Sequence, residues 1–287
     1  MTTPHPLGEF LLARRARLQP GEVGLPVGTG LRRTQGLRRE ELAALAGLSI
    51  QYYTRLEQGR ETNPGGAVLD RIAAALRLND EEHAHLYALA NHAAERVPAP
   101  DVRADREVRP GIAALLERVR PWPAYLLTRT GDILAINPEA LALFPGLADW
   151  EPERRNTIRY LFLHPAAREL FVDWERAALG TTAELHALLA ADPQVSDLVA
   201  LVDELKAGSP EFVAPWNRYD VGHRRADQER YRHPLLGDIT LAFEVLWLEG
   251  GQRITIHQPP DPDDDRGRRA LRALSRSVAE SHPAASG

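Results

Sequence analysis

Apolar residues recur every three or four positions over roughly the first ninety residues, which is the spacing of amphipathic helices. The stretch 19–36 interrupts this pattern with many glycines and prolines, so we predict a long loop there. The predicted helices cover residues 7–18, 38–46, 50–58 and 67–78, and a fifth begins near Asn79. In the second of these helices we expect Leu42 and Leu45 to be buried. The pattern therefore predicts an all-α domain of five helices.

The hydrophobic period changes after residue 110. Short apolar runs at 125–128 and 133–136 flank a polar turn, which predicts a β-hairpin, and residues 138–205 are mainly helical in pattern. Odd positions over 239–247 are apolar and alternate with more polar ones, as in a strand with one buried face. After Gly250-Gly251 a returning strand is predicted around Ile254 and Ile256. This half is predicted to be an α+β domain.

These patterns divide the chain into four parts. We predict a helical domain over 1–94, a charged, proline-interrupted linker over 95–110, an α+β domain over 111–260 and a charged tail over 261–287. One short helix is predicted within the tail, around 268–278. The tail also begins with an acidic run. Because that run lacks the spacing of a calcium loop, we interpret it as solvated charge.

Composition and charge narrow the class of protein. The chain has no cysteine, which excludes disulfides and thiolate metal sites, and no apolar run near the roughly 18 residues that a membrane span needs. The first twenty residues also lack the pattern of a signal peptide, so we predict a cytoplasmic protein with no membrane partner. The net charge is −5, yet the first 60 residues hold nine arginines and five acidic residues and carry +4. The basic end is the N-terminal one.

The segment GLRREELAALAGLSIQYYTRLEQGR has the features of a helix-turn-helix. Gly47 stands at the corner, and Ser49 is placed to cap the second helix. If Leu48, Tyr53 and Leu56 face the core, the second helix presents an outward face that can enter the major groove. The predicted base-reading residues on that face are Ser49, Ile50, Gln51, Tyr52 and Arg55.

Each of these side chains has a matching base chemistry. Gln51 can pair bidentately with adenine, Arg55 with guanine or phosphate, and Ile50 can contact a thymine methyl group. Tyr52 is equally compatible with a packing role. Double-stranded DNA is therefore the expected partner, and a homodimer is expected because one recognition helix reads only a few base pairs.

Charged residues beside this helix are assigned different tasks. Arg38, Arg39 and Arg60 flank the helix pair and are predicted to contact phosphates. Glu57 is predicted to be structural and to pair with Arg14 or Arg15 of the first helix.

Residues 7–90 resemble the lambda-repressor-like, Xre-type helix-turn-helix family, and LRREELAALAGLSIQYYTRLEQGR resembles the subgroup that carries an MmyB-type ligand-binding domain. The second half of the chain is similar to that domain in several motifs. They are RNTIRYLFLHP, Trp174-Glu175, Ser209-Pro210-Glu211-Phe212, Trp216, Asp220-Val221 and HPLLGDITLAFEVL. One departure is Leu185-His186, where the family usually has Leu-Arg, and the loop that follows is shorter here.

The resemblance implies a PAS-like fold, in which helices close an apolar cavity over an antiparallel sheet. It also implies a fatty acid or similar amphipathic ligand, whereas the residues themselves indicate no particular cofactor. The candidate ligand contacts are Asn156, Arg159, His186, Phe243 and Trp247. The apolar stripe of the strand is equally typical of a solid core without a ligand.

The function predicted from these observations is sequence-specific DNA binding by a transcription regulator, controlled by a small apolar or fatty-acid-like ligand. The alternative is a DNA-binding regulator whose C-terminal domain serves only dimerisation or protein recruitment. An enzyme is not expected, because the sequence has no cysteine nucleophile, G-x-S-x-G, phosphate-binding glycine loop or H-E-x-x-H.

Overall fold

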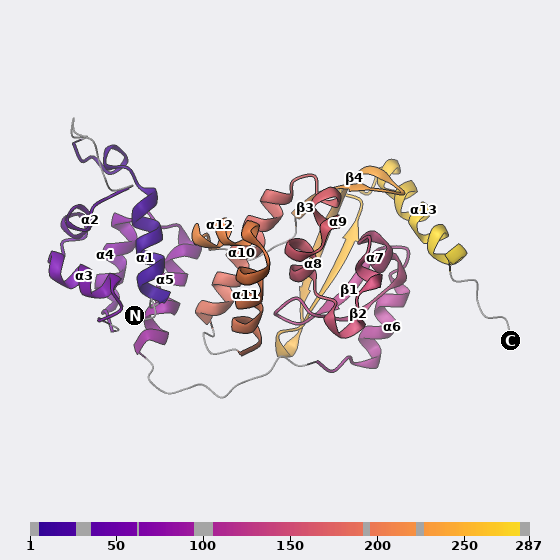
Figure 1. The fold of residues 1–287 in the computed structure, drawn as a ribbon, viewed down its shortest axis with the longest axis horizontal. Helices are drawn as coiled ribbons and strands as arrows, with labels where there is room; N and C mark the ends of the chain where they lie inside the picture. The colour runs from indigo at the N-terminus through magenta and orange to yellow at the C-terminus, as the bar shows by residue number, and fades with distance from the viewer. Residues whose placement is uncertain are drawn as a thin grey trace. The chain divides into compact units, whose positions relative to one another are not determined.

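The computed structural model describes residues 6–26, 36–61, 63–94, 106–191, 196–221 and 227–281 (Figure 1). The chain forms two compact units. The N-terminal unit contains residues 1–101, 182–195 and 214–223, and the sheet unit contains residues 102–181, 196–213 and 224–287. The predicted linker over 95–110 lies outside the described residues as far as 105, and so do residues 27–35 of the predicted loop.

The five helices predicted for the N-terminal domain are confirmed. They are α1 (Pro6–Arg17), α2 (Arg39–Leu45), α3 (Ile50–Glu57), α4 (Gly66–Ala75) and α5 (Asp80–Ala94), with a short 3-10 helix η1 (Pro20–Val23). Phe10, Leu42, Tyr53 and Leu86 are fully buried among them. Leu45 is 38% exposed, so its predicted burial is wrong. It lies three residues after Leu42, near the edge of the buried stripe of α2, where neighbouring helices no longer cover it.

Local capping chemistry sets the ends of the two central helices. The hydroxyl of Ser49 accepts the backbone N–H of Tyr52 at 3.2 Å and caps α3 as predicted. Gly47 has φ +63°, a left-handed conformation that glycine adopts without the cost a side chain adds. The chain therefore turns sharply between α2 and α3.

The sheet unit contains one five-stranded antiparallel sheet in the order β2-β1-β5-β4-β3. Its strands are β1 (Ala124–Leu127), β2 (Ile133–Ile136), β3 (Asp227–His233), β4 (Gly237–Trp247) and β5 (Arg253–Gln258). The predicted hairpin and the two C-terminal strands are confirmed. Strand β3 was not predicted, because DQERYRH contains only one apolar residue, Tyr231.

The helices of the sheet unit, with the elements shared between the units, follow the chain in this order. They are α6 (Pro110–Arg118), α7 (Pro138–Leu143), η2 (Leu147–Asp149), η3 (Pro152–Arg154), α8 (Thr157–Leu163), α9 (Pro165–Leu170), α10 (Trp174–Ala191), α11 (Ser196–Gly208), α12 (Pro210–Asn217), η4 (Glu249–Gly251) and α13 (Asp265–Ser281). Helices α10 and α12 each contribute residues to both units.

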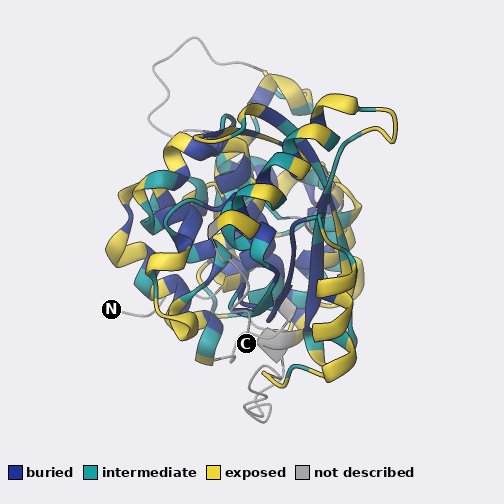
Figure 2. Ribbon diagram, turned by 90° about the vertical axis from the view of Figure 1, so that its right-hand side faces the viewer, coloured by how far each residue is buried: buried dark blue, intermediate teal, exposed yellow. Residues whose placement is uncertain are grey.

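Helices cover the sheet on its two faces, and Figure 2 shows the strands as largely buried. On one face, Leu116 of α6 packs with Leu126 and Ile254. On the other face, Leu241 and Phe243 of β4 are buried with the aromatic side chains of neighbouring strands.

Helix α13 extends beyond the short tail helix that was predicted. Leu271, Leu274 and Val278 are buried, and the helix contacts α7 and β4. The spacing of these three residues places them on one helical face, and that face joins the core.

Candidate functional site

The outward face of α3 gathers the predicted base-reading residues. Ser49, Ile50, Gln51 and Arg55 are exposed, Ile50 to 47%, whereas Tyr53 and Leu56 are fully buried beneath them. Tyr52 is half-buried, and the guanidinium of Arg55 lies 5.8 Å from the centre of its ring. The helix therefore has one anchored face and one face available to a partner.

A buried carboxylate fixes α3 to the helices beside it. Glu57 accepts hydrogen bonds from Nε and Nη2 of Arg15 at 2.9 and 3.0 Å, and from Nε of Arg39 at 2.8 Å. Burial alone would raise the pKa of Glu57, but the hydrogen bonds and charges of Arg15 and Arg39 give a net lowering. The predicted pairing of Glu57 with Arg15 is confirmed, while Arg14 pairs with Glu82 at 2.5 Å.

The three predicted phosphate contacts are all exposed at the ends of the helix pair. The side chain of Arg39 is 45% exposed although its Nε binds Glu57. Arg38 pairs with Glu40 at 3.4 Å, and Arg60 makes no ion pair with the part of the chain that the structure describes. Arg39 thus has a structural bond and free guanidinium edges, whereas Arg60 is available without that structural role.

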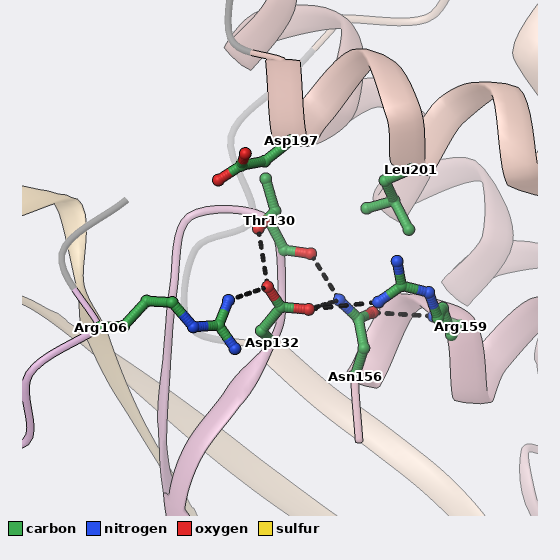
Figure 3. Close-up of a pocket in the computed structure, with 7 residues that line it drawn as sticks. All are labelled: Arg106, Thr130, Asp132, Asn156, Arg159, Asp197 and Leu201. Carbon is green, nitrogen blue, oxygen red and sulfur yellow. Dashed lines mark hydrogen bonds and ion pairs between the residues drawn. The ribbon is translucent and has the colours of Figure 1, made fainter. Parts of the chain in front are cut away.

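The sheet unit has a polar pocket of about 230 Å³ (Figure 3). It is lined by Arg106, Thr130, Asp132, Asn156, Arg159, Asp197 and Leu201. The structure thus brings together two predicted ligand contacts, Asn156 and Arg159, from the start of α8.

Asn156 uses its whole amide within the fold. Its oxygen accepts the backbone N–H groups of Ile158 and Arg159 at 2.8 and 2.9 Å and so caps α8. Its amide nitrogen donates to the carbonyl of Thr130 at 2.9 Å and to Oδ1 of Asp132 at 2.8 Å. Asn156 therefore joins the β1–β2 hairpin to α8.

Two arginines neutralise Asp132 in the same pocket. Arg106 reaches Oδ2 at 2.9 Å, and Arg159 reaches Oδ1 at 3.2 Å while its Nε binds Glu204 at 2.8 Å. The side chain of Arg159 is 24% exposed, which leaves part of its guanidinium facing the pocket (Figure 3).

The chain matches two family models, one in each half. Residues 7–86 match a helix-turn-helix domain, and residues 108–274 match the MmyB-like transcription regulator ligand binding domain. This chain belongs to the MmyB-like transcription regulator family. No curated protein matches it. The two domains make it a DNA-binding transcription regulator with a ligand-binding domain, and both families are regulator rather than enzyme families.

No described helix of this MmyB-like regulator combines the length and apolar character that a membrane crossing requires. The helical N-terminal domain and the α+β domain with an antiparallel sheet confirm the predicted fold class.

An aromatic cluster surrounds His257 on the buried face of the sheet in this MmyB-like regulator. The hydroxyl of Tyr125 lies 3.0 Å from Nε2 of His257, and the rings of Phe144, Tyr231 and Phe243 lie about 6.1 Å from the imidazole. Phe243, a predicted ligand contact, is in this cluster. The sequence analysis missed His257, although its position two residues after Thr255 on a predicted strand was an available signal.

Trp247, another predicted ligand contact, is 51% exposed. The guanidinium of Arg253 lies 5.3 Å from the centre of its ring. Strand β3 pairs with β4 only as far as Phe243, so the end of β4 projects beyond its neighbour. Trp247 therefore lies apart from the polar pocket and from the buried aromatic cluster.

Part of the ligand-binding domain sequence is built into the N-terminal unit of the regulator. Ala190 of α10 and Tyr219, which follows α12, join the hydrophobic core of the helix-turn-helix domain. Nη2 of Arg14 donates to the carbonyl of Tyr219 at 2.7 Å, and Arg17 pairs with Asp220 at 2.5 Å. These contacts tie α1 to residues more than 200 positions away.

His186, the predicted ligand contact that replaces the family arginine, lies in the same place. Its ring stacks between Trp216 and Tyr219, with ring centroids at 3.9 and 3.8 Å, and Nε2 lies 3.0 Å from the carbonyl of Trp216. His186 is only 2% exposed. It therefore connects α10 to the segment that contacts α1 and does not approach Asn156 or Arg159 within its unit.

Proposed function

We propose that this chain is a sequence-specific DNA-binding regulator whose affinity for its operator changes when a small apolar or fatty-acid-like molecule binds the C-terminal domain. The observation that carries this proposal is the sharing of α10 and α12 between the two units. The ends of these helices reach the core of the helix-turn-helix domain through His186 and Tyr219. A ligand that displaces either helix would act directly on α1.

The DNA contacts follow from the exposed face of α3. Gln51 and Arg55 are proposed to read bases with Ser49, Ile50 and Tyr52, because these residues share the face that the core leaves open. Arg38, Arg39 and Arg60 are proposed to hold phosphates. A homodimer would pair two such faces on half-sites about one helical turn of DNA apart.

The ligand class follows from the family and from the chemistry of the sheet unit. A PAS-like domain with the aromatic cluster around Phe243 suits an apolar ligand body. Arg159 is the proposed contact for a carboxylate head group, because part of its guanidinium faces the polar pocket. Asn156 would support that contact by holding the start of α8, and Trp247 and His186 stay candidates outside the pocket.

Native mass spectrometry of the purified protein, followed by gel-shift titration of a selected operator, tests this proposal. The titration compares delipidated protein with the same protein reloaded with palmitic acid. A coupling of about 1–3 kcal/mol would change the operator affinity by about 5- to 150-fold. Equal affinities, together with a dimeric mass that holds no ligand, would instead support a domain that only dimerises or recruits a protein.

A further inference from the structure

The C-terminal helix α13 carries a concentration of positive charge in an acidic part of the chain. After residue 60 the chain has a net charge of −9, yet α13 contains five arginines and only two acidic residues. Its apolar side is buried through Leu271, Leu274 and Val278. The hydroxyl of Ser275 also donates to Oε1 of Glu139 on α7 at 2.7 Å. These contacts fix which side of α13 faces outward.

Three arginines occupy that outward side. Arg269, Arg272 and Arg276 are exposed, and their spacing of three and four residues places them on one helical face. At 1.5 Å per residue they extend along about 10 Å of the helix axis. They form a row of guanidinium groups opposite the buried leucines.

Most other arginines of the sheet unit are committed to partners within the fold. Examples are Arg120 with Glu139 at 2.9 Å, Arg230 with Asp173 at 2.7 Å and Arg232 with Asp238 at 3.1 Å. By contrast, no ion pair within 4 Å joins Arg269, Arg272 or Arg276 to any residue that the structure describes.

The acidic residues of α13 leave this row positive. Asp265, in the first turn, is bonded to Arg268 at 2.6 Å, and this bond is the main reason why its pKa is lowered. Glu280, in the last turn, is exposed and makes no ion pair with the described residues. Two acidic groups therefore face five arginines, one of which already neutralises Asp265.

We infer that Arg269, Arg272 and Arg276 of α13 form a second DNA contact surface, which binds phosphates. Guanidinium groups match phosphate oxygens bidentately, and the partner that this regulator already binds is a polyanion. Because phosphate contacts carry no sequence information, this surface adds affinity and not specificity. The inference rests on DNA binding by the helix-turn-helix domain and does not depend on the ligand.

The test compares two triple variants with the same change in net charge. Arg269→Gln/Arg272→Gln/Arg276→Gln removes the row, and the control variant, Arg109→Gln/Arg118→Gln/Arg154→Gln, removes three exposed arginines that are equally without ion pairs among the described residues. Fluorescence anisotropy measures the binding of a labelled duplex of about 30 base pairs to the full chain. The salt concentration is varied from about 50 to 200 mM.

Each lost phosphate contact lowers the slope of log K against log salt by about 0.9, so the row variant should lose up to about 2.7 in slope. The control should keep the parent slope, and both variants should keep the parent ratio of operator to non-operator affinity. An unchanged slope in the row variant, or an equal loss in the control, would overturn the inference. A parent chain that binds no duplex would refute the proposed function as well, so the two failures are distinguishable.

Discussion

Replacing Glu57 with glutamine should destabilise the helix-turn-helix domain strongly. The side chain of Glu57 is 2% exposed and accepts three charge-assisted hydrogen bonds, two from Arg15 and one from Arg39. Glutamine keeps the shape but replaces one acceptor oxygen with an NH₂ donor that faces a guanidinium donor. Breaking a buried pair from one side costs about 3–5 kcal/mol, and the remaining amide oxygen reduces this to about 2–4 kcal/mol.

Hydrogen exchange of α1 and α3 peptides in the full chain measures this effect. The protection of their core amides should fall by about 30- to 1000-fold, which corresponds to 2–4 kcal/mol. The matched control is Glu61→Gln, which removes a more exposed ion pair with Arg55 at 3.4 Å and should cost at most about 1 kcal/mol. Equal protection in the two variants would refute the claim that the buried carboxylate holds α3.

The same residue predicts a pH dependence. The pKa of Glu57 is lowered in the folded state, so its contribution to stability is complete above the unfolded value near 4.3 and is lost as the pH falls through the folded value. Urea denaturation followed by circular dichroism should therefore show a shallower loss of stability below about pH 4.3 in Glu57→Gln than in the parent chain.

Three further outcomes are expected. Gln51→Ala should relax base preference in a binding selection, whereas Arg60→Ala should weaken all duplexes alike and lower the salt slope by about 0.9; a change of base preference in the latter would refute the assignment. Asn156→Ala should lower the unfolding free energy by about 2–4 kcal/mol in urea denaturation, because it removes the α8 cap and two buried bonds to the hairpin, and a loss under 1 kcal/mol would contradict this role. Burial lowers the pKa of His233, whose Nδ1 accepts the N–H of Leu235, so stability should decline as the pH falls below about 6.5, and His233→Gln should remove that decline.

Local sequence determined the elements of this protein and much of the DNA-binding face. Helical spacing, the glycine at position 47 and the cap at Ser49 act within a few residues of one another, so they predicted α2, the turn and α3 without knowledge of the fold. The alternation along β4 did the same for the clearest strand. The pairing of Glu57 with Arg15 was also predictable, because a carboxylate on a buried helix face needs a cationic partner and the preceding helix offered one.

Tertiary structure decided the roles that depend on distant neighbours. Asn156 has the composition of a ligand contact, but a hairpin some 25 residues earlier takes up its amide. His186 lies among rings because the chain returns at Trp216 and Tyr219, and Tyr219 in turn packs against Phe10. A sequence pattern records which side of an element is apolar. Which partner covers that side depends on contacts between residues that can be 200 positions apart, and those contacts form only when the whole chain folds.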